Sequence, residues 1–165
     1  TLPAVRMAVE ALKELGMHRD GVQLIVSGGI RSGADVAKAI ALGADAVSIG
    51  TAALIALGDN NPDLEEEYNK LGTTAGFYDE WQAGDDPAGI TTQDEKLAAR
   101  LDPKKGGEKL ANYLKVLTLE AQTLARACGK SHIRNLEPED LNALTLEASA
   151  MAKVPLAGTD WIPGK

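Results

Sequence analysis

Two glycine-containing turns, each directly after a short apolar run, carry the residues best suited to chemistry in this sequence. Gly28-Gly29 follows the apolar residues 22–26, and Gly50-Thr51 follows residues 46–49. Glycine allows the main chain to come close to an anion, and main-chain N–H groups in such turns bind phosphate. We therefore predict that both turns contact a ligand phosphate, with Arg31 as the candidate counter-charge. Turns without any ligand, and an Arg31 side chain that faces solvent, stay open as alternatives.

The segment between the turns predicts the elements that position them. Residues 32–42 form a helical pattern of small side chains, which Ser32 caps together with Asp35 and which Gly43 ends. The β-branched apolar runs on either side are long enough for buried parallel strands. In a (β/α)8 barrel, the loops after the last two strands commonly bind a phosphate. The predicted fold class is therefore α/β, as the C-terminal portion of a (β/α)8 (TIM) barrel followed by a helical tail.

The chain is too short for a whole barrel. It has 165 residues, whereas a complete barrel takes about 250. The sequence opens with Thr1-Leu2-Pro3, with no initiator methionine and no targeting segment, so we expect a C-terminal piece that forms an incomplete barrel on its own. The missing strands would come from an upstream segment or from another chain.

Charge and cysteine content exclude several classes of function. The formal net charge of −7 argues against a nucleic-acid surface, which needs clustered Lys and Arg. The charge favours small-molecule substrates instead. No apolar stretch reaches the roughly 18 residues of a membrane span, so we expect no membrane. Cys128 is the one cysteine, which excludes an internal disulfide and favours a cytoplasmic protein. Cys128 is expected to pack at a helix end. His18 is expected to face solvent in a loop, and His132 has no partner at metal spacing, so no metal site is predicted.

Three regions differ in composition. Residues 1–58 are expected to hold the last two strand–helix units of the barrel, residues 59–106 form a loop-rich acidic insert, and residues 107–165 form helices that pack on the barrel. The tail is expected to hold two helices, over residues 107–127 and 138–152.

Aromatic and acidic residues stand out within the insert. Phe77, Tyr78 and Trp81 are expected to pin the loop to the barrel, or alternatively to cover a ligand. Asp85 and Asp86 lie between Gly84 and Pro87, so they are predicted to form a turn and not a metal pair.

Motifs along nearly the whole chain resemble one family. Residues 26–30 and 49–58 look like the end of the FMN-binding barrel of glutamate synthases, and residues 89–94, 125–131 and 135–141 match the same family in the same order. The first 58 residues alone also resemble inosine monophosphate dehydrogenases and flavin-dependent hydroxy-acid oxidases, but the tail discriminates against both. The resemblance implies that FMN is the ligand whose phosphate the glycine turns bind. The implied contacts are Gly28, Gly29, Arg31, Gly50 and Thr51.

One departure from the family pattern concerns cysteine. Glutamate synthases carry three cysteines before the Gly-Ile/Val-x-Thr-Gln segment, and these bind an iron–sulfur cluster. This sequence has none there, and Asp59 stands where the first cysteine is expected. Carboxylates do not replace thiolates in such clusters, so we expect FMN and no iron–sulfur cluster on this chain. The form of residues 81–89 is similar to the glutamate-synthase-like subunits of methylamine–glutamate N-methyltransferases.

That similarity implies a redox-neutral reaction. Methylamine would replace the amino group of L-glutamate, giving N-methylglutamate and ammonia. The flavin would take a hydride from the α-carbon and return it after the amine exchange, so no external electron donor would be needed. The implied partners are other subunits of a glutamate-synthase-like complex.

Two alternatives stay open. The chain could belong to a ferredoxin- or NADPH-dependent glutamate synthase that aminates 2-oxoglutarate, or it could be a non-catalytic fragment whose leucine-bearing tail helices bind a partner subunit. In the family, the residues that bind substrate and move protons lie mostly upstream. The catalytic residues are therefore unknown, and the fragment alone is expected to be inactive.

Overall fold

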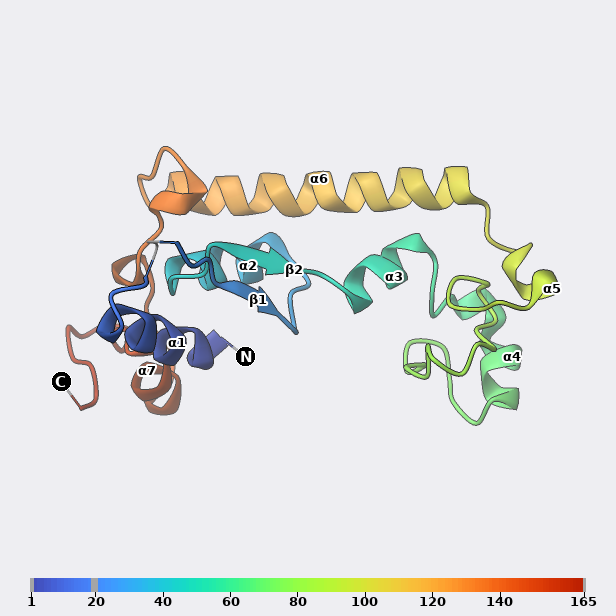
Figure 1. Ribbon diagram of the computed structural model, residues 1–165, viewed down its shortest axis with the longest axis horizontal. Helices are drawn as coiled ribbons and strands as arrows, with labels where there is room; N and C mark the ends of the chain where they lie inside the picture. Colours follow the sequence, from blue (N-terminus) through green and yellow to red (C-terminus); the bar gives the residue numbers. More distant parts are fainter. Residues whose placement is uncertain (1, 19–20, 165) are drawn as a thin grey trace. The chain divides into compact units, whose positions relative to one another are not determined.

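The structure is a computed structural model that describes residues 2–18 and 21–164. The chain divides into two compact units: unit 1 comprises Thr1–Ile49 and Val116–Lys165, and unit 2 comprises Gly50–Lys115. Figure 1 shows the helices and strands of both units, coloured along the sequence. Within the described residues, no helix is both long enough and apolar enough to cross a membrane.

Unit 1 contains a small parallel sheet. Strands β1 (Ile25–Ser27) and β2 (Ala46–Ser48) pair in register, with Ser27 opposite Ser48. Helix α2 (Gly33–Ala41) connects them, so the predicted strand–helix–strand unit and the α/β class are confirmed. Both strands are shorter than predicted. Each has one paired neighbour in the described sheet, and Ile25 is 62% exposed, so little holds the flanking residues in a ladder.

The caps predicted for α2 are present. The Ser32 hydroxyl accepts a hydrogen bond from the Asp35 N–H, and the Asp35 carboxylate accepts one from the Ser32 N–H, which together form a capping box. Gly43 follows the helix with a φ of +113°, a value that favours glycine, so the predicted left-handed stop is confirmed. A Cβ at Gly43 would lie 2.7 Å from Val9 Cγ2 of helix α1 (Leu2–Glu14), so this glycine also allows α1 to pack closely.

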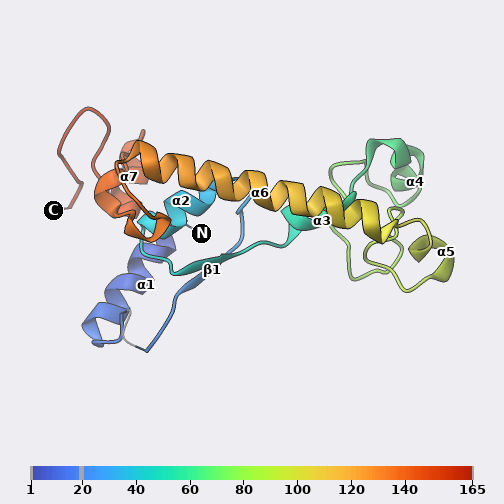
Figure 2. The same cartoon turned by 90° about the horizontal axis from the view of Figure 1, so that it is seen from above.

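Helix α2 packs on the long helix α6 (Pro103–Ala127) at its first residue. A Cβ at Gly33 would overlap the Leu117 carbonyl oxygen and the Ala121 nitrogen of α6. Figures 1 and 2 both show α2 lying beside the C-terminal half of α6. Gly33 is therefore needed for helix packing, which is a different role from that of the glycines in the preceding turn.

The other helices of unit 1 come from the two ends of the chain. Helix α1 lies beside α7 (Leu146–Ala152), and the Lys153 ammonium contacts the Glu10 carboxylate at 2.9 Å. The 3₁₀ turn η2 (Ile133–Asn135) contacts α2.

The two predicted tail helices differ from those observed. α6 begins at Pro103 and not at residue 107, because the Asp102 carboxylate caps it by accepting from the backbone N–H groups of Lys104 and Lys105. The helix predicted over residues 138–152 is two elements, the 3₁₀ turn η3 (Pro138–Asp140) and α7. The helix does not continue past η3, because the next residue, Leu141, is extended with φ −112° and ψ 142°.

Unit 2 is built from short elements joined by long loops. Its helices are α3 (Thr51–Leu57), η1 (Pro62–Leu64), α4 (Glu65–Lys70) and α5 (Glu95–Ala98), followed by the first half of α6. Two tyrosines form its core: Tyr68 and Tyr78 are buried, with ring centroids 5.5 Å apart.

Two predictions about burial are wrong. Phe77 is 79% exposed, so only Tyr78 and Trp81 of the three aromatic residues pack, and their contacts lie within the insert; packing on the barrel stays a prediction. Cys128 is exposed and not packed, because it lies in the turn after the last residue of α6, beyond the helix end at Ala127.

Candidate functional site

The turn after β1 has the backbone geometry that its glycines predict. Gly28 and Gly29 have φ angles of +101° and +76°, in the region that side chains disfavour. A Cβ at Gly29 would meet no atom within 4 Å, so the space over this part of the main chain is open. Because β1 and β2 are parallel and in register, their carboxyl ends lie at the same edge of the sheet, and the Gly28-Gly29 turn leaves from that edge.

The N-terminus of α2, which begins next to this turn, is already occupied by carboxylates. Asp35 Oδ2 accepts from the backbone N–H groups of Arg31 and Ser32, at 3.0 and 3.1 Å. Glu120 Oε2, from α6, accepts from the Gly33 N–H at 2.6 Å. Burial acts to raise the pKa of Asp35, but these hydrogen bonds outweigh it and the pKa is lowered. The carboxylates thus take the place that an anion would otherwise occupy at this helix end.

A phosphate-bearing cofactor such as FMN therefore fits this region at one place. The Gly28-Gly29 turn offers left-handed main chain with open space above it, whereas the first turn of α2 does not. Arg31 lies between the two, and its side chain is exposed while its N–H is held by Asp35. Gly28, Gly29 and Arg31 are thus brought together on one short segment.

The second predicted turn belongs to unit 2. Gly50 is the N-cap of α3 with φ −113° and ψ −91°, and no side chain caps the helix there. A Cβ at Gly50 would meet no atom within 4 Å, and Thr51 is exposed as the first helical residue. Since Gly50 and Thr51 lie in a different compact unit from Gly28 and Gly29, a shared phosphate site stays a prediction.

The cysteine-free segment that begins at Asp59 is folded around buried hydrogen bonds. Asp59 is 2% exposed, and its carboxylate accepts from Trp81 Nε1 at 2.8 Å and from the Asn60 N–H at 2.8 Å. The Asn60 side chain in turn bonds the backbone of Tyr78 twice, with its Oδ1 accepting at 2.9 Å and its Nδ2 donating at 3.0 Å. The Tyr68 hydroxyl accepts a second bond from the Asn60 N–H at 2.9 Å. We call these five residues the Asp59 network.

A second carboxylate, that of Asp86, shapes the following loop. Asp86 is fully buried, and its oxygens accept from the backbone N–H groups of Ala88, Ile90 and Thr91 at 2.9 to 3.1 Å. Its carbonyl oxygen accepts from the Gly89 N–H, so the predicted turn at Asp86 is confirmed.

Burial governs the titration of these groups. Burial raises the pKa of Asp59, against the lowering effect of the Trp81 hydrogen bond, and the nearby Asp86 charge raises it further. Burial also raises the pKa of Tyr68 to about 12 and shifts that of Tyr78 upward. Both tyrosines therefore keep their protons at neutral pH.

An iron–sulfur cluster does not fit this segment. Residues 59–89 contain no cysteine, and the Asp59 oxygens are already engaged by three N–H donors. In the part of the chain that the structure describes, no group of three or more His, Cys, Asp or Glu side chains is placed to hold a metal ion.

The sequence identified some of these residues and missed others. Asp59, Tyr78, Trp81 and Asp86 were singled out from the sequence, but Asn60 was not. One signal was present. Asn60 has a φ of +59° in the turn just before η1, and Asn is among the few residues that adopt such values. The five residues of the Asp59 network come together through tertiary packing, which no local sequence pattern reports.

Comparisons with known proteins identify the family of this chain. A model of the conserved region in glutamate synthase matches residues 1–61 and 82–131. The glutamate synthase large subunit-like protein of Rhizobium meliloti is 74% identical over 165 residues, which are 100% of this chain and 37% of that protein. The archaeal NADPH glutamate synthase of Methanocaldococcus jannaschii is 41% identical over 136 residues, or 80% of this chain and 23% of the relative. The archaeal-type NADPH glutamate synthase of Thermotoga maritima is 39% identical over 133 residues, or 81% of this chain and 23% of the relative.

The chain thus spans about a quarter to a third of the length of these relatives. No solved structure matches it. The family model covers both glycine turns and residues 107–131 of the tail but leaves residues 62–81 unmatched, and it shows that the chain belongs to the glutamate synthase family.

Proposed function

We propose that this chain is part of an FMN-dependent, glutamate-synthase-like enzyme subunit that makes N-methylglutamate from methylamine and L-glutamate and releases ammonia. The observation that carries the proposal is the Asp59 network. A segment with no thiolate is folded by carboxylate and amide hydrogen bonds, with Asp59 taking part in three of them. Residues 62–81, which contribute Tyr68, Tyr78 and Trp81, also fall outside the match to the family model.

The proposed reaction needs no electrons from outside. Loss of a hydride from the α-carbon and a proton from nitrogen converts glutamate into a 2-imino acid. Methylamine adds to the imine carbon, ammonia leaves, and return of the hydride with a proton gives N-methylglutamate. Bound FMN would supply the reversible hydride transfer. The substrate would give two electrons to the flavin and would take two electrons back. The reaction would therefore need no cluster to bring electrons to the flavin.

This chain would bind the cofactor and not the substrate. The N–H groups of the Gly28-Gly29 turn would contact the FMN phosphate, with Arg31 as counter-charge. Gly50 and Thr51 are proposed as further contacts. The left-handed φ of Gly29 and the open space above it support the first assignment.

The first experiment uses the intact protein under anaerobic conditions. We expect L-glutamate alone to bleach the flavin absorbance, and ¹⁵N-labelled methylamine then to appear in N-methylglutamate without added reductant. Turnover that depends on NADPH or ferredoxin would refute the amine-exchange reaction.

A substitution at Gly29 tests the phosphate site, and the chain offers a matched control. Gly29 and Gly129 have φ angles of +76° and +73°, and a Cβ at either would meet no atom within 4 Å. Alanine should therefore impose the same backbone strain of roughly 1 kcal/mol at both. We expect Gly29→Ala to weaken FMN binding by about tenfold, since one charge-assisted hydrogen bond is worth roughly 1.5–3 kcal/mol. Gly129→Ala should leave the affinity unchanged, and equal affinities in the two variants would contradict the assignment.

A second candidate function is supported by the named relatives. The proteins of Methanocaldococcus jannaschii and Thermotoga maritima are NADPH glutamate synthases, at 41% and 39% identity. The present chain could serve the same reductive amination of 2-oxoglutarate, with electrons arriving by another route. Bleaching of the flavin by NADPH, together with no response to glutamate alone, would support this second function.

A further inference from the structure

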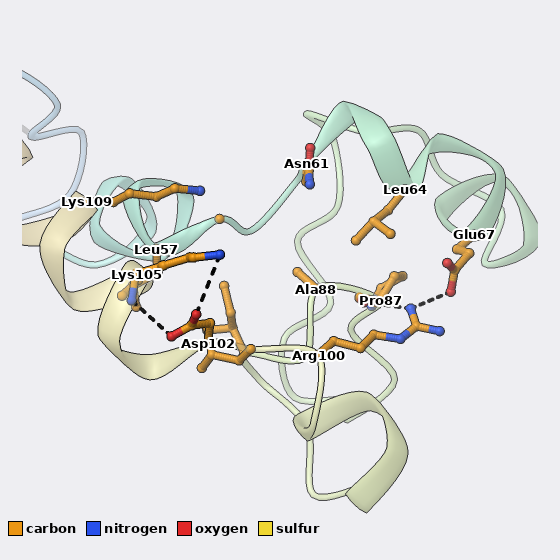
Figure 3. Close-up of a pocket in the computed structure, with 14 residues that line it drawn as sticks. Leu57, Asn61, Leu64, Glu67, Pro87, Ala88, Arg100, Asp102, Lys105 and Lys109 are labelled. Carbon is orange, nitrogen blue, oxygen red and sulfur yellow. Dashed lines mark hydrogen bonds and ion pairs between the residues drawn. The ribbon is translucent and has the colours of Figure 1, made fainter.

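Unit 2 contains a cavity that the proposed cofactor site does not use. Its volume is about 530 Å³, within the ~300–1,000 Å³ typical of small-molecule pockets. Figure 3 shows the cavity with Leu57, Lys105 and Lys109 on one side and Leu64, Glu67 and Pro87 on the other. All of its lining residues belong to unit 2, whereas Gly28, Gly29 and Arg31 belong to unit 1.

The inner wall of the cavity is apolar. Leu57 comes from the end of α3 and Leu64 from the end of η1. Pro87, Ala88 and Ile90 come from the loop that Asp86 holds in place. A compact hydrocarbon body would be desolvated against this wall.

Ion pairs at one end of the cavity are already formed. Arg100 Nη1 donates to Glu67 Oε2 at 2.6 Å and to the Pro87 carbonyl oxygen at 2.9 Å. Figure 3 shows this pair closing the end of the cavity that is formed by α4. The guanidinium of Arg100 therefore closes the cavity and is not its anion-binding group.

Two lysines at the other end have weaker partners. The Asp102 carboxylate is engaged mainly with the backbone N–H groups that it caps, and its contact with Lys105 Nζ is long, at 3.9 Å. Lys109 forms no ion pair with any residue that the structure describes, and it is exposed. Lys105 and Lys109 are four residues apart on α6, so they lie on the same face of the helix.

The cavity is thus positive in a chain that is negative overall. Three cationic and two acidic side chains line it, against a net charge of −7 for the whole chain. We infer that it binds a small organic carboxylate with a compact apolar body. The carboxylate contacts the ammonium groups of Lys105 and Lys109, and the body packs on Leu57 and Leu64.

A pair of isosteric probes tests this inference in the intact protein. Phenylbutyrate carries the required carboxylate, and phenylbutanol has the same body without the charge. By isothermal titration calorimetry, we expect saturable binding of phenylbutyrate and about fivefold weaker binding of the alcohol, as one or two solvent-exposed ion pairs would give.

Two lysine variants locate the site. Lys109→Met keeps most of the side-chain stem but removes the charge, and it should reduce the affinity for phenylbutyrate by about three- to fivefold without changing that for phenylbutanol. Lys104→Met is the matched control, because Lys104 is exposed near the start of α6 but does not line the cavity, and it should change neither affinity. Failure of phenylbutyrate to bind, equal affinities for acid and alcohol, or the same loss in both variants would overturn the inference. None of these measurements depends on the flavin or on turnover.

Discussion

Removal of the Asp59 carboxylate should open the segment that it holds. In the native structure this side chain accepts from Trp81 Nε1 at 2.8 Å, and from the backbone and side-chain nitrogens of Asn60 at 2.8 and 3.2 Å. The two Asn60 donors have other acceptors, the Tyr68 hydroxyl and the Tyr78 carbonyl oxygen. In Asp59→Ala, the indole N–H of Trp81 is therefore the donor that loses its acceptor.

The size of the effect follows from that difference. A buried donor left without an acceptor costs ~1–3 kcal/mol, and the loss of two shared hydrogen bonds adds up to ~1 kcal/mol. Relief of the buried charge offsets part of this cost, because burial raises the pKa of Asp59. A net loss of about 2 kcal/mol is expected, which makes local opening about thirtyfold more frequent.

Hydrogen exchange at the Tyr78 amide in the intact protein measures this opening. That N–H donates to Asn60 Oδ1 at 2.9 Å, so it exchanges when the Asp59 network separates. The matched control is Asp63→Ala, which removes an exposed carboxylate from the same segment. A Trp81→Phe variant adds a double-mutant cycle, and the coupling with Asp59→Ala should be about 1 kcal/mol.

Either of two results would refute this reasoning. Exchange at Tyr78 could be equally fast in the Asp59→Ala and Asp63→Ala variants, or the coupling between Asp59 and Trp81 could be zero. Both would mean that the tyrosine core, and not the carboxylate, holds the segment.

Two further predictions concern packing and pH. Gly33→Ala should destabilise unit 1 by ~2 kcal/mol in thermal unfolding, because the new methyl group meets the α6 backbone at Leu117. The control is Gly107→Ala, at an open helical position, which should be neutral or stabilising. Because the folded pKa of Asp59 is raised, its contribution to stability is greatest below its unfolded pKa of ~3.9 and declines as pH rises through the folded value. The protection of amides against exchange should fall with pH in this way, and Asp59→Asn should remove that pH dependence.

Local signals explain which helices could be predicted. Ser32, Asp35 and Gly43 lie next to the helix that they delimit, and the structure confirms all three roles. The start of α6 was missed because Gly106 and Gly107 have low helix propensity. The helix nevertheless starts before these glycines, because the Asp102 carboxylate accepts from the Lys104 and Lys105 N–H groups. The cap thus outweighs the low propensity at that point.

The same contrast applies to the candidate sites. The Gly28-Gly29 turn was predictable, because only glycine readily adopts φ angles of +101° and +76° after a strand. The Glu120 carboxylate at the N-terminus of α2 was not predictable, because Glu120 lies 87 residues further along the chain than Gly33, whose N–H it binds. Within unit 1, this long-range contact leaves the Gly28-Gly29 turn, and not the N-terminus of α2, as the proposed phosphate contact.

Hydrogen bonds from side chains to the backbone continue from the Asp59 network into the next helix, and this continuity suggests what the cysteine-free segment supplies. Asp86 fixes the N–H groups of Ile90 and Thr91, and the Thr92 hydroxyl bonds the Gly84 carbonyl and accepts from the Asp94 N–H. Asp94 then caps α5. Irregular backbone held at each step by a side chain is ordered without regular secondary structure. The segment can therefore position residues 89–94, which resemble the family, while the electrons of the proposed exchange stay between flavin and substrate.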